Sequence, residues 1–329
     1  MHKNPSYSIF CLPRVECISP QEFETNFIQP QMPCIISGLA KWPALELWDR
    51  SYLRNIYGDR IVRASRSVNH MHPDLSHAPA PPPTIRLRFA DYVDLVWSGA
   101  TSAKNLFAIG DSIPIYSEQT ASPKEVSPLL NDVELPQFVD RTSLRFVGLW
   151  LSAQGTGSWL HYDANGCHNL NVQVRGRKRV VMCSPDRCDL LYPYARTMFD
   201  VSLGQFSQVN VFEPDLDRFP LFAHVVQWTG TLEVGDAVFI PAYWYHAFSH
   251  DGDVNINVNF WWLPERQFVN GVTAREVLLA ALAKDALDGD AGGDVAAKVA
   301  ALGGDMSELI RRLELAVFSP RLPGRSERV

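Results

Sequence analysis

The sequence predicts a mainly β protein with a jelly-roll core (a double-stranded β-helix) over residues 143–264, an α+β N-terminal region (1–142) and a helical C-terminal region (265–329). Eight short segments of strand character, separated by turns, occur between Leu144 and Trp262, and eight is the strand count of a jelly roll. Helix-start signals occur before and after this stretch. Hydrophobic residues make up 46% of the 329 residues, which is enough for a large core without disulfides.

The N-terminal region carries signals for short helices and strands. Ser19, Pro20 and Glu22 form a capping box with a proline at the first helical position, which predicts a helix through Phe27. Residues 68–84 are predicted to be a loop, because consecutive prolines fit neither a helix interior nor a central strand. The other predicted elements are a strand over Pro33–Gly38, a helix around Ser51–Tyr57, a strand over Ile61–Ala64 and a helix over Phe89–Trp97.

The core strands are predicted from β-branched and aromatic residues bounded by turn residues. They are Leu144–Leu151, Ser158–Asp163, Asn169–Arg175, Arg179–Ser184, Val225–Thr229, Ala237–Ile240, Trp244–His250 and Val254–Trp262. After Pro264 the pattern becomes helical, and Thr273 and Glu276 form a second capping box that opens a helix to about Leu287. Further helix follows, with an apolar stripe that ends at Val317.

Composition excludes several classes of protein. The 30 basic and 36 acidic residues give a net charge of -6, which argues against a globally basic nucleic-acid binder but permits a local basic patch. Nine tryptophans and 17 phenylalanines exclude a disordered chain. The six cysteines include no CxxC pair and indicate neither a disulfide framework nor a zinc ribbon. Without a signal-peptide pattern or a long apolar stretch, we expect a soluble cytoplasmic protein, or a nuclear one if the source is eukaryotic.

A candidate metal site lies on the predicted strand Ser158–Asp163. Side chains alternate along a strand, so His161 and Asp163 share a face and offer two neighbouring ligands to a divalent metal. His246, on a late strand, is the best candidate for a third ligand. Two histidines and a carboxylate on one side of a metal form the facial triad of non-haem Fe(II) oxygenases. An HxD pattern by itself is weak, because it also occurs by chance in ordinary strands.

Two further predicted strands carry rows of amide side chains. Asn169–Val174 and Val254–Phe260 both alternate polar and aliphatic residues. This pattern fits a sheet with one wet face, or a barrel whose polar interior holds a hydrogen-bonding ligand. Asparagine is a poor strand former, and an ordinary solvent face would carry Thr, Lys or Glu, so the barrel interior is favoured.

The charged residues after the first amide row allow two interpretations each. Lys178 shares an apolar strand face with Val180 and Met182, where it needs an anionic partner unless it snorkels to water. The basic run Arg175–Arg179 could bind nucleic acid, but it spans a predicted turn, which favours arginines exposed at one end of the barrel.

The remaining histidines give weaker signals. His70, His72 and His77 lie in the proline-rich loop, where a solvated loop is favoured over a metal site. His168 is close to the candidate site and fits a core residue, or one that supports a ligand, better than a ligand itself. Nothing in the sequence decides a role for His224 or His250.

In combination, these segments resemble the JmjC/cupin-type (cupin-8-like) 2-oxoglutarate oxygenases, and within them the small hydroxylase branch that includes an asparaginyl hydroxylase and a tRNA wybutosine hydroxylase. The resemblance runs through most of the chain. The matching segments, in family order, are PCIISGLAKWPALELW, HYD, NLNVQVRGRKRVVMCSP, LYPY, FSQVNVFEPDLDRFPLF, LEVGDAVFIPAYWYHAF and NINVNFWW.

The resemblance implies a role for each residue of the site. It implies that Fe(II) is bound by His161, Asp163 and His246. It implies further that Lys178, assisted by Ser158, binds the distal carboxylate of 2-oxoglutarate, that Asn169, Asn259 and Tyr116 hydrogen-bond this cosubstrate, and that Trp261 lies near the substrate entrance. The loop Ala164–His168 is two residues longer than in the asparaginyl hydroxylase, so substrate specificity does not transfer.

The implied activity is Fe(II)- and 2-oxoglutarate-dependent hydroxylation, which uses O2 and yields succinate and CO2. A side chain of a protein or peptide is the preferred substrate. A modified tRNA base or a small molecule is the alternative, and the net charge of -6 disfavours a long phosphate footprint. A non-catalytic cupin-like metal-binding protein is the third hypothesis. The C-terminal helices resemble a dimerisation region of related hydroxylases and predict either a homodimer or a cover for the barrel.

Overall fold

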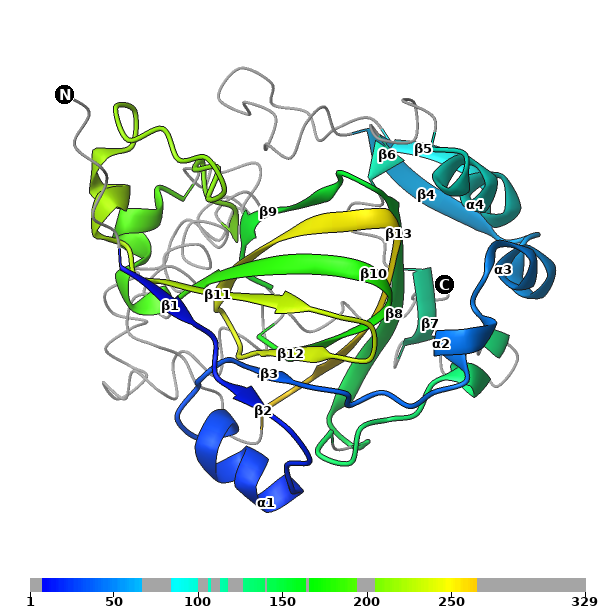
Figure 1. Cartoon of the computed structure of the whole chain (residues 1–329), viewed down its shortest axis with the longest axis horizontal. Helices are drawn as coiled ribbons and strands as arrows, with labels where there is room; N and C mark the ends of the chain where they lie inside the picture. Colours follow the sequence, from blue (N-terminus) through cyan, green and yellow to red (C-terminus); the bar gives the residue numbers. More distant parts are fainter. Residues whose placement is uncertain are drawn as a thin grey trace, which may run out of the picture.

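The computed structural model describes residues 8–66, 84–99, 106–107, 113–117, 127–139, 141–163, 166–193 and 205–264. A curled, mixed sheet of ten strands forms the centre of the described part, and a few short helices lie at its periphery (Figure 1). The mainly β fold with a jelly-roll core is therefore confirmed. The predicted C-terminal helices (265–329) and the dimerisation inferred from them lie outside the described residues.

The predicted N-terminal elements are present close to their expected bounds. They are α1 (Pro20–Phe23) with a π-helical continuation (Glu24–Ile28), β3 (Cys34–Ile36), α3 (Arg50–Tyr57), β4 (Ile61–Arg66) and α4 (Phe89–Trp97). The capping box forms as predicted: the Glu22 backbone N–H donates to Ser19 Oγ at 3.2 Å, and the Ser19 backbone N–H donates to Glu22 Oε2 at 3.0 Å. These mutual bonds satisfy donors that a helix start would otherwise leave unpaired.

Several short elements were not predicted, because segments this short carry little periodicity. They are β1 (Ile9–Cys11), β2 (Arg14–Val15), α2 (Ala44–Leu47), β5 (Thr84–Arg88), β6 (Leu106–Phe107), β7 (Ile113–Ser117) and 3-10 turns at Pro128–Asp132, Pro185–Leu191 and Pro220–His224. The proline-rich loop was predicted over residues 68–84: residues 68–83 lie outside the described part, and Thr84 begins β5. No helix within the described ranges has both the length and the apolar character needed to cross a membrane.

Two long strands dominate the core, where the sequence predicted four short ones. β10 (His168–Cys183) and β13 (Tyr245–Trp262) each run without interruption through positions that we expected to be turns. Gly176 and Gly252 have positive φ angles of +78° and +106°, and the register between the two strands shifts beside Gly176. A Cβ on Gly176 would lie 2.4 Å from the carbonyl oxygen of Val254. Glycine therefore lets these strands bend sharply without ending.

The bend places the two halves of β10 beside different strands. The first half pairs with β12 (Ala237–Ile240), and the second half pairs with β11 (Gln227–Leu232). β8 (Leu144–Ala153) and β9 (Gly157–His161) both pair with β13. The N-terminal strands join this same sheet, since β3 pairs with β12 and β1 pairs with β11. The barrel thus includes strands from both ends of the described chain (Figure 1).

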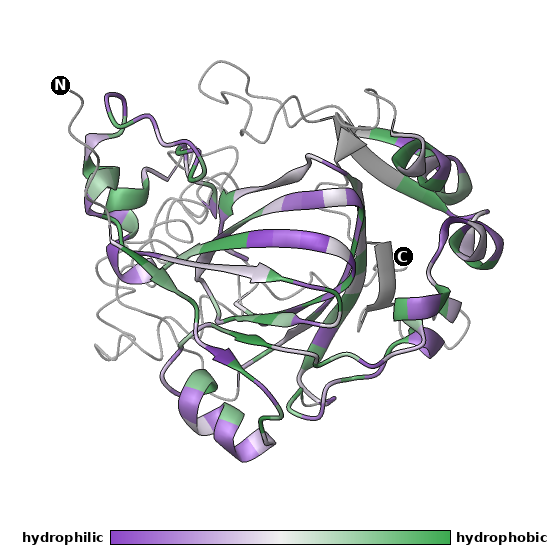
Figure 2. Ribbon diagram, viewed as in Figure 1, coloured by the Kyte–Doolittle hydropathy of each residue, from purple (hydrophilic) through white to green (hydrophobic). Residues whose placement is uncertain are grey.

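Alternation along the central strands separates an apolar outer face from a mixed interior. Leu170, Val172 and Val174 belong to a large apolar cluster that also contains core residues of α1, α3 and α4. The intervening amides face the barrel interior and are at most 3% exposed. Figure 2 shows the result as alternating hydrophilic and hydrophobic bands along the central strands.

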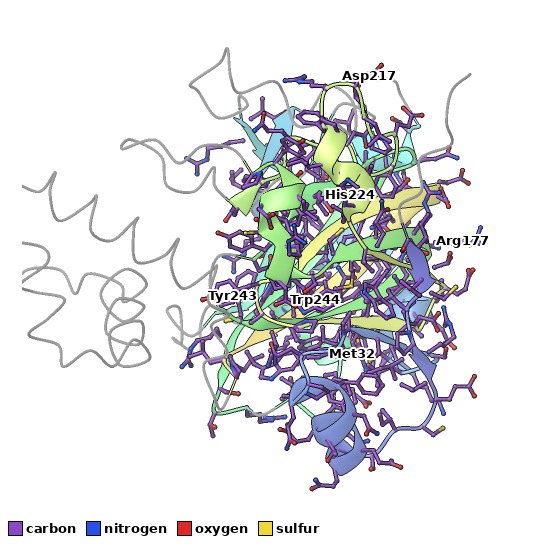
Figure 3. The ribbon with its side chains drawn as sticks, turned by 90° about the vertical axis from the view of Figure 1, so that its left-hand side faces the viewer. Met32, Arg177, Asp217, His224, Tyr243 and Trp244 are labelled. Atoms are coloured by element: carbon purple, nitrogen blue, oxygen red, sulfur yellow. The ribbon has the colours of Figure 1, made fainter. Side chains whose placement is uncertain are left out.

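The basic run on β10 also alternates, but the irregularity around Arg175 reverses which positions face the interior. Arg175, Arg177 and Arg179 are exposed, whereas Lys178 is completely buried. Arg177 extends from the side of the molecule in Figure 3, where its Nε donates to Glu233 Oε1 at 2.8 Å. The prediction of exposed arginines is confirmed, but the turn expected at this position was wrong, because the strand continues through Gly176.

Candidate functional site

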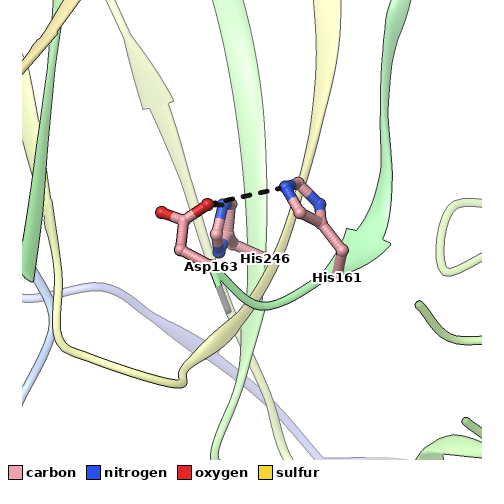
Figure 4. A group of neighbouring side chains, drawn as sticks. All are labelled: His161, Asp163 and His246. Atoms are coloured by element: carbon pink, nitrogen blue, oxygen red, sulfur yellow. Dashed lines mark ion pairs between the residues drawn. The ribbon is translucent and has the colours of Figure 1, made fainter. Parts of the chain in front are cut away.

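Three candidate ligands converge on one point inside the barrel. The ligand atoms of His161, Asp163 and His246 all lie within 4.8 Å of one another (Figure 4). Asp163 Oδ1 lies 3.9 Å from His161 Nε2 and 4.0 Å from His246 Nε2. His161 ends β9 and His246 lies directly opposite it at the start of β13, so strand pairing brings together residues distant in sequence. The structure therefore shows a possible His–Asp–His metal site.

Asp163 reaches this point by a route that the sequence did not predict. We expected a strand through Asp163, but β9 ends at His161 and Asp163 lies beyond it. The argument from strand alternation was therefore wrong in detail. Tyr162 nevertheless turns away from the two ligands, as predicted, and is buried in an apolar cluster with Tyr243 and Tyr245.

Backbone carbonyls orient both imidazoles. His161 Nδ1 lies 2.8 Å from the carbonyl oxygen of Trp159, and His246 Nδ1 lies 3.0 Å from that of Trp244. A carbonyl oxygen only accepts hydrogen bonds, so each Nδ1 carries the proton and donates it. This leaves Nε2, the ring nitrogen nearer Asp163, as the atom of each imidazole that can bind a metal.

Asp163 is held as an anion. Its Oδ2 accepts hydrogen bonds from Asn169 Nδ2 and Trp261 Nε1, each at 2.9 Å, which leaves Oδ1 facing the imidazoles. Burial raises the pKa of Asp163, but the nearby His246 and His161 and the two hydrogen bonds outweigh it, so the pKa falls below its usual value.

Burial lowers the pKa of His246, whereas it acts to raise the pKa of Asp163. Desolvation, reinforced by the neighbouring His161, lowers the pKa of His246 to about 4. His246 is therefore neutral near pH 7 while Asp163 is ionised, and both are in the protonation state in which they can bind a cation.

Lys178 is buried in the interior with no counter-ion in the described part of the chain. Its side chain is 0% exposed, so it does not snorkel to water, and burial lowers its pKa well below the usual value. Its Nζ donates to Asn171 Oδ1 and lies 4.4 Å from the centre of the Phe248 ring. No carboxylate among the described residues forms an ion pair with it. Ser158 contacts the backbone of the same phenylalanine: its Oγ accepts a hydrogen bond from the Phe248 N–H at 3.0 Å.

Of the other residues predicted to bind the cosubstrate, the structure describes the side chains of Asn169 and Asn259 but not that of Tyr116. Asn169 and Asn259 lie beside the ligand cluster and bond to each other, with Asn259 Nδ2 donating to Asn169 Oδ1 at 3.0 Å. Tyr116 is on β7, paired with Val147, but its side chain lies outside the described part. The loop identified as longer includes residues 164–165, which are also outside it.

The remaining histidines stay away from the cluster or outside the described residues. His168 is a core residue: it packs against Phe239 and Trp262, and burial lowers its pKa to about 3. His250 Nδ1 lies 2.8 Å from Ser152 Oγ and 2.9 Å from Thr156 Oγ1. The prediction for His70, His72 and His77 falls outside the described residues.

Three features of the site were missed. The Trp261 indole bonds directly to Asp163, where only a place near the entrance was expected, and Asn171 bonds to the lysine. Alternation could have suggested Asn171, because it shares a strand face with Asn169. Phe206, whose ring is 5.7 Å from that of His161 at an interplanar angle of 25°, had no signal in the sequence.

The fold and this geometry agree with the comparison against known families. The Cupin-like domain family matches residues 20–268, and the chain therefore belongs to this JmjC-type family. Homologues in this family are typically Fe(II)/2-oxoglutarate-dependent oxygenases.

Individual relatives cover the chain to different extents. The human protein "tRNA wybutosine-synthesizing protein 5" is 28% identical over 261 residues, which cover 76% of this chain and 77% of that protein. "Lysine-specific demethylase 8" of Danio rerio is 29% identical over 268 residues, covering 79% and 59%. "Jumonji C domain-containing protein 5" of Drosophila melanogaster is 26% identical over 258 residues, covering 76% and 59%. The chain thus spans about three-fifths of the length of the latter two relatives.

Proposed function

We propose that this protein is an Fe(II)- and 2-oxoglutarate-dependent oxygenase that hydroxylates a side chain of a protein or peptide. The observation that carries the proposal is the convergence of two imidazoles and one carboxylate, with ligand atoms within 4.8 Å of one another, in a barrel that also buries a lysine. Neither feature stabilises the chain by itself, because buried polar groups and charges are costly without a partner.

The donor set fits Fe(II). Two imidazole nitrogens and one carboxylate oxygen on one side of a metal leave the opposite positions open for other ligands. The Nδ1 atoms of His161 and His246 already donate to carbonyls, and Asp163 is held through Oδ2, so every ligand has the support that metal-binding residues usually have. Mn(II), Co(II) and Zn(II) would also bind such a set, so the native metal requires measurement.

The interior also fits a small dicarboxylate. An anionic group beside Lys178 would form a charge-assisted hydrogen bond with its amine, and Ser158 bonds to the backbone of Phe248, whose ring contacts the lysine. Asn169 and Asn259 offer amide groups on the metal side of this pocket. Lys178 would therefore hold the distal carboxylate of 2-oxoglutarate, and the asparagines would orient its metal-binding end.

In the reaction, the chain positions its reactants and excludes water. Iron with 2-oxoglutarate supplies O2 activation for hydroxylation, with succinate and CO2 as co-products. His161, Asp163 and His246 would hold the metal, and Asn169 and Trp261 keep the carboxylate of Asp163 oriented. The apolar walls that include Val180, Met182 and Phe248 keep bulk water from this space and strengthen its electrostatic interactions.

A protein or peptide substrate is supported by the net charge of -6 and by the relatives named as demethylases. A modified tRNA base is the second candidate, favoured by one specific observation: the relative named for tRNA wybutosine synthesis is matched over 77% of its own length. A non-catalytic metal-binding protein is the third, and it predicts metal binding without succinate formation.

The test begins with an anaerobic titration of the purified protein with Fe(II) and 2-oxoglutarate, followed by a succinate assay on peptide, tRNA and metabolite pools. Succinate formation stimulated by peptides supports the proposal, and stimulation by tRNA alone supports the second candidate. A salt titration of tRNA binding separates specific use from adventitious contact, because phosphate contacts give a steep salt dependence. Metal binding without succinate in any pool would overturn the enzymatic assignment.

A further inference from the structure

A continuous chain of buried side-chain amides runs through the barrel interior and ends on Asp163. We call it the amide chain, and its members, in order, are Gln173, Asn255, Asn257, Asn259 and Asn169. The successive donor–acceptor distances are 2.7, 3.1, 2.5 and 3.0 Å, and the last bond, from Asn169 to Asp163, is 2.9 Å. All five amides are at most 3% exposed.

Every bond in the amide chain has the same direction. Each NH2 group donates to the carbonyl oxygen of the next amide, and the final NH2 group, on Asn169, donates to Asp163 Oδ2. Asp163 as a carboxylate only accepts, so it determines the orientation of the Asn169 amide. Turning over any one amide would place two oxygens or two NH2 groups face to face, and the orientation of each member therefore depends on its neighbours.

The far end of the amide chain favours the same direction. Gln173 Nε2 also donates to the backbone carbonyl of Arg175 at 2.6 Å, at the irregular part of β10. A backbone carbonyl only accepts, so this bond directs the NH2 group of Gln173 toward Asn255. Gln173 Oε1 has no hydrogen-bond partner in the described part of the chain, so no contact there holds the reverse orientation.

The acceptors at the two ends give all five amides one orientation, which stabilises the carboxylate of Asp163. The amide dipoles align with their positive ends toward Asp163, and hydrogen bonds in series strengthen one another in a low-dielectric interior. The effect reaches Asn169 and Asn259, which lie beside the ligands, from Gln173, Asn255 and Asn257, whose side-chain bonds in the described part are to other amides and to the Arg175 carbonyl.

We propose that Gln173, Asn255 and Asn257 are positioning residues for the metal site. They hold the amides of Asn259 and Asn169 in one orientation and thereby keep Asp163 Oδ1 directed at the point between the imidazoles. The role toward a metal rests on the proposed function, whereas the coupling along the amide chain is a property of the metal-free protein.

The test replaces one end of the amide chain and compares it with a matched buried glutamine. Gln173→Leu removes the first donor, and Gln227→Leu changes an equally buried glutamine on β11 that is not a member of the chain. In the metal-free protein, Gln173→Leu is expected to shift the side-chain NH2 resonances of Asn259 and Asn169, several hydrogen bonds away, and Gln227→Leu is expected to leave them unchanged. Asn257→Leu, which interrupts the amide chain in the middle, is measured in the same way if Gln173→Leu does not fold.

The second readout is Co(II) affinity, followed by the ligand-field absorption of the bound ion. We expect Gln173→Leu to weaken Co(II) binding about 10-fold, the lower end of the range for residues that support metal ligands, with no such loss for Gln227→Leu. Unshifted Asn resonances and unchanged affinity in a folded Gln173→Leu protein would overturn the inference, as would an equal loss in both variants. If the wild-type protein binds no Co(II), the proposed function fails, and the resonances alone then decide whether the amides are coupled.

Discussion

At the scale of single residues, the site combines groups that are unfavourable without a ligand. His161, Asp163 and His246 bring their ligand atoms within 4.8 Å of one another, and Asp163 Oδ1 lies 3.9 Å and 4.0 Å from the two Nε2 atoms. Lys178 adds a buried cationic group whose hydrogen-bond partner is the neutral Asn171. Desolvation of such groups opposes folding. Replacing one of them is therefore expected to remove function while leaving stability unchanged or increased.

Removing one ligand should remove activity without unfolding the protein. We expect His161→Ala or Asp163→Ala to abolish succinate formation and to leave the thermal unfolding midpoint close to that of the wild type, because none of the three ligands belongs to an apolar core cluster. The measurement is a succinate assay with Fe(II) in excess, and His224→Ala, in a 3-10 turn away from the cluster, is the control. Normal turnover in either ligand variant would refute the assignment of the metal site.

Replacing the buried lysine should stabilise the ligand-free protein. Lys178→Met keeps the length of the side chain but removes an amine that burial desolvates and that no carboxylate among the described residues compensates, so we expect the free energy of unfolding to rise by about 1–4 kcal/mol. The same variant should lose 2-oxoglutarate binding, because the distal carboxylate loses its partner. Chemical unfolding and isothermal titration check the two effects, and a destabilised variant that still binds 2-oxoglutarate would contradict both.

Buried histidines predict how the stability of the metal-free protein depends on pH. Burial lowers the pKa of His246 to about 4 and that of His168 to about 3, whereas an unfolded histidine has a pKa near 6.5. Between these values the unfolded state binds more protons than the folded state, so lowering the pH favours unfolding.

We therefore expect the free energy of unfolding to be constant near pH 7.5 and to fall from about pH 6.5 downward, by up to about 1.4 kcal/mol per pH unit for each histidine. Urea unfolding in a chelator-containing buffer at pH 7.5, 6.5, 5.5 and 4.5 measures this slope. His168→Phe, which removes one of the two groups, should reduce it, and a stability that stays flat down to pH 4.5 would disprove the prediction.

At the scale of elements, the bend in β10 and β13 decides which residues meet. The first half of β10 carries Asn169 and Gln173 beside β12, and the second half carries Lys178 beside β11. Because both halves belong to one strand, Lys178 from the second half reaches Asn171 from the first half across the interior. The local reason for the bend is Gly176, whose φ of +78° lies in the region that other residues rarely adopt.

Substituting Gly176 should lower the free energy of unfolding by more than the left-handed backbone conformation alone would explain. In Gly176→Ala the new Cβ would lie 2.4 Å from Val254 O, and we expect a loss of about 2–4 kcal/mol, combining the steric conflict with the cost of a left-handed conformation. Gly155→Ala is the matched control, because Gly155 has a φ of +74° with no atom within 4 Å of the added Cβ. It should lose only about 1–2 kcal/mol. Equal losses of unfolding free energy in the two variants would show that the close approach to Val254 does not matter.

At the scale of the whole molecule, N-terminal and core segments form one sheet around the site. β3 extends the half of the barrel that carries the amides, and β1 extends the half that carries Lys178. The helices α1, α3 and α4 contribute to the apolar cluster behind the amide-bearing strands. This cluster keeps the backs of these strands dry, so the amides bond inside the barrel, to one another, to Asp163, to Lys178 and to the backbone carbonyl of Arg175.

The sequence by itself determined the local features. The capping box at Ser19, the helix over Phe89–Trp97 and the alternation that places Asn169 and Asn171 on one face all follow from short-range rules of backbone geometry, and all are present. The residues His161, Asp163 and His246 were also identifiable, because their side-chain chemistry and order match the JmjC/cupin-type pattern.

Only the tertiary structure decided how these pieces meet. Glycine and charged residues at 175–179 read locally as a turn, but pairing with β13 on one side and β11 and β12 on the other keeps the strand continuous. Asp163 lies beyond its strand, and its position is determined by hydrogen bonds from Asn169 and Trp261. The direction of the amide chain likewise depends on the acceptor at each end, the Arg175 carbonyl and Asp163 Oδ2. Only folding brings the five amides together between these two acceptors. Contacts between distant segments, and not local propensity, therefore convert a list of candidate residues into a site.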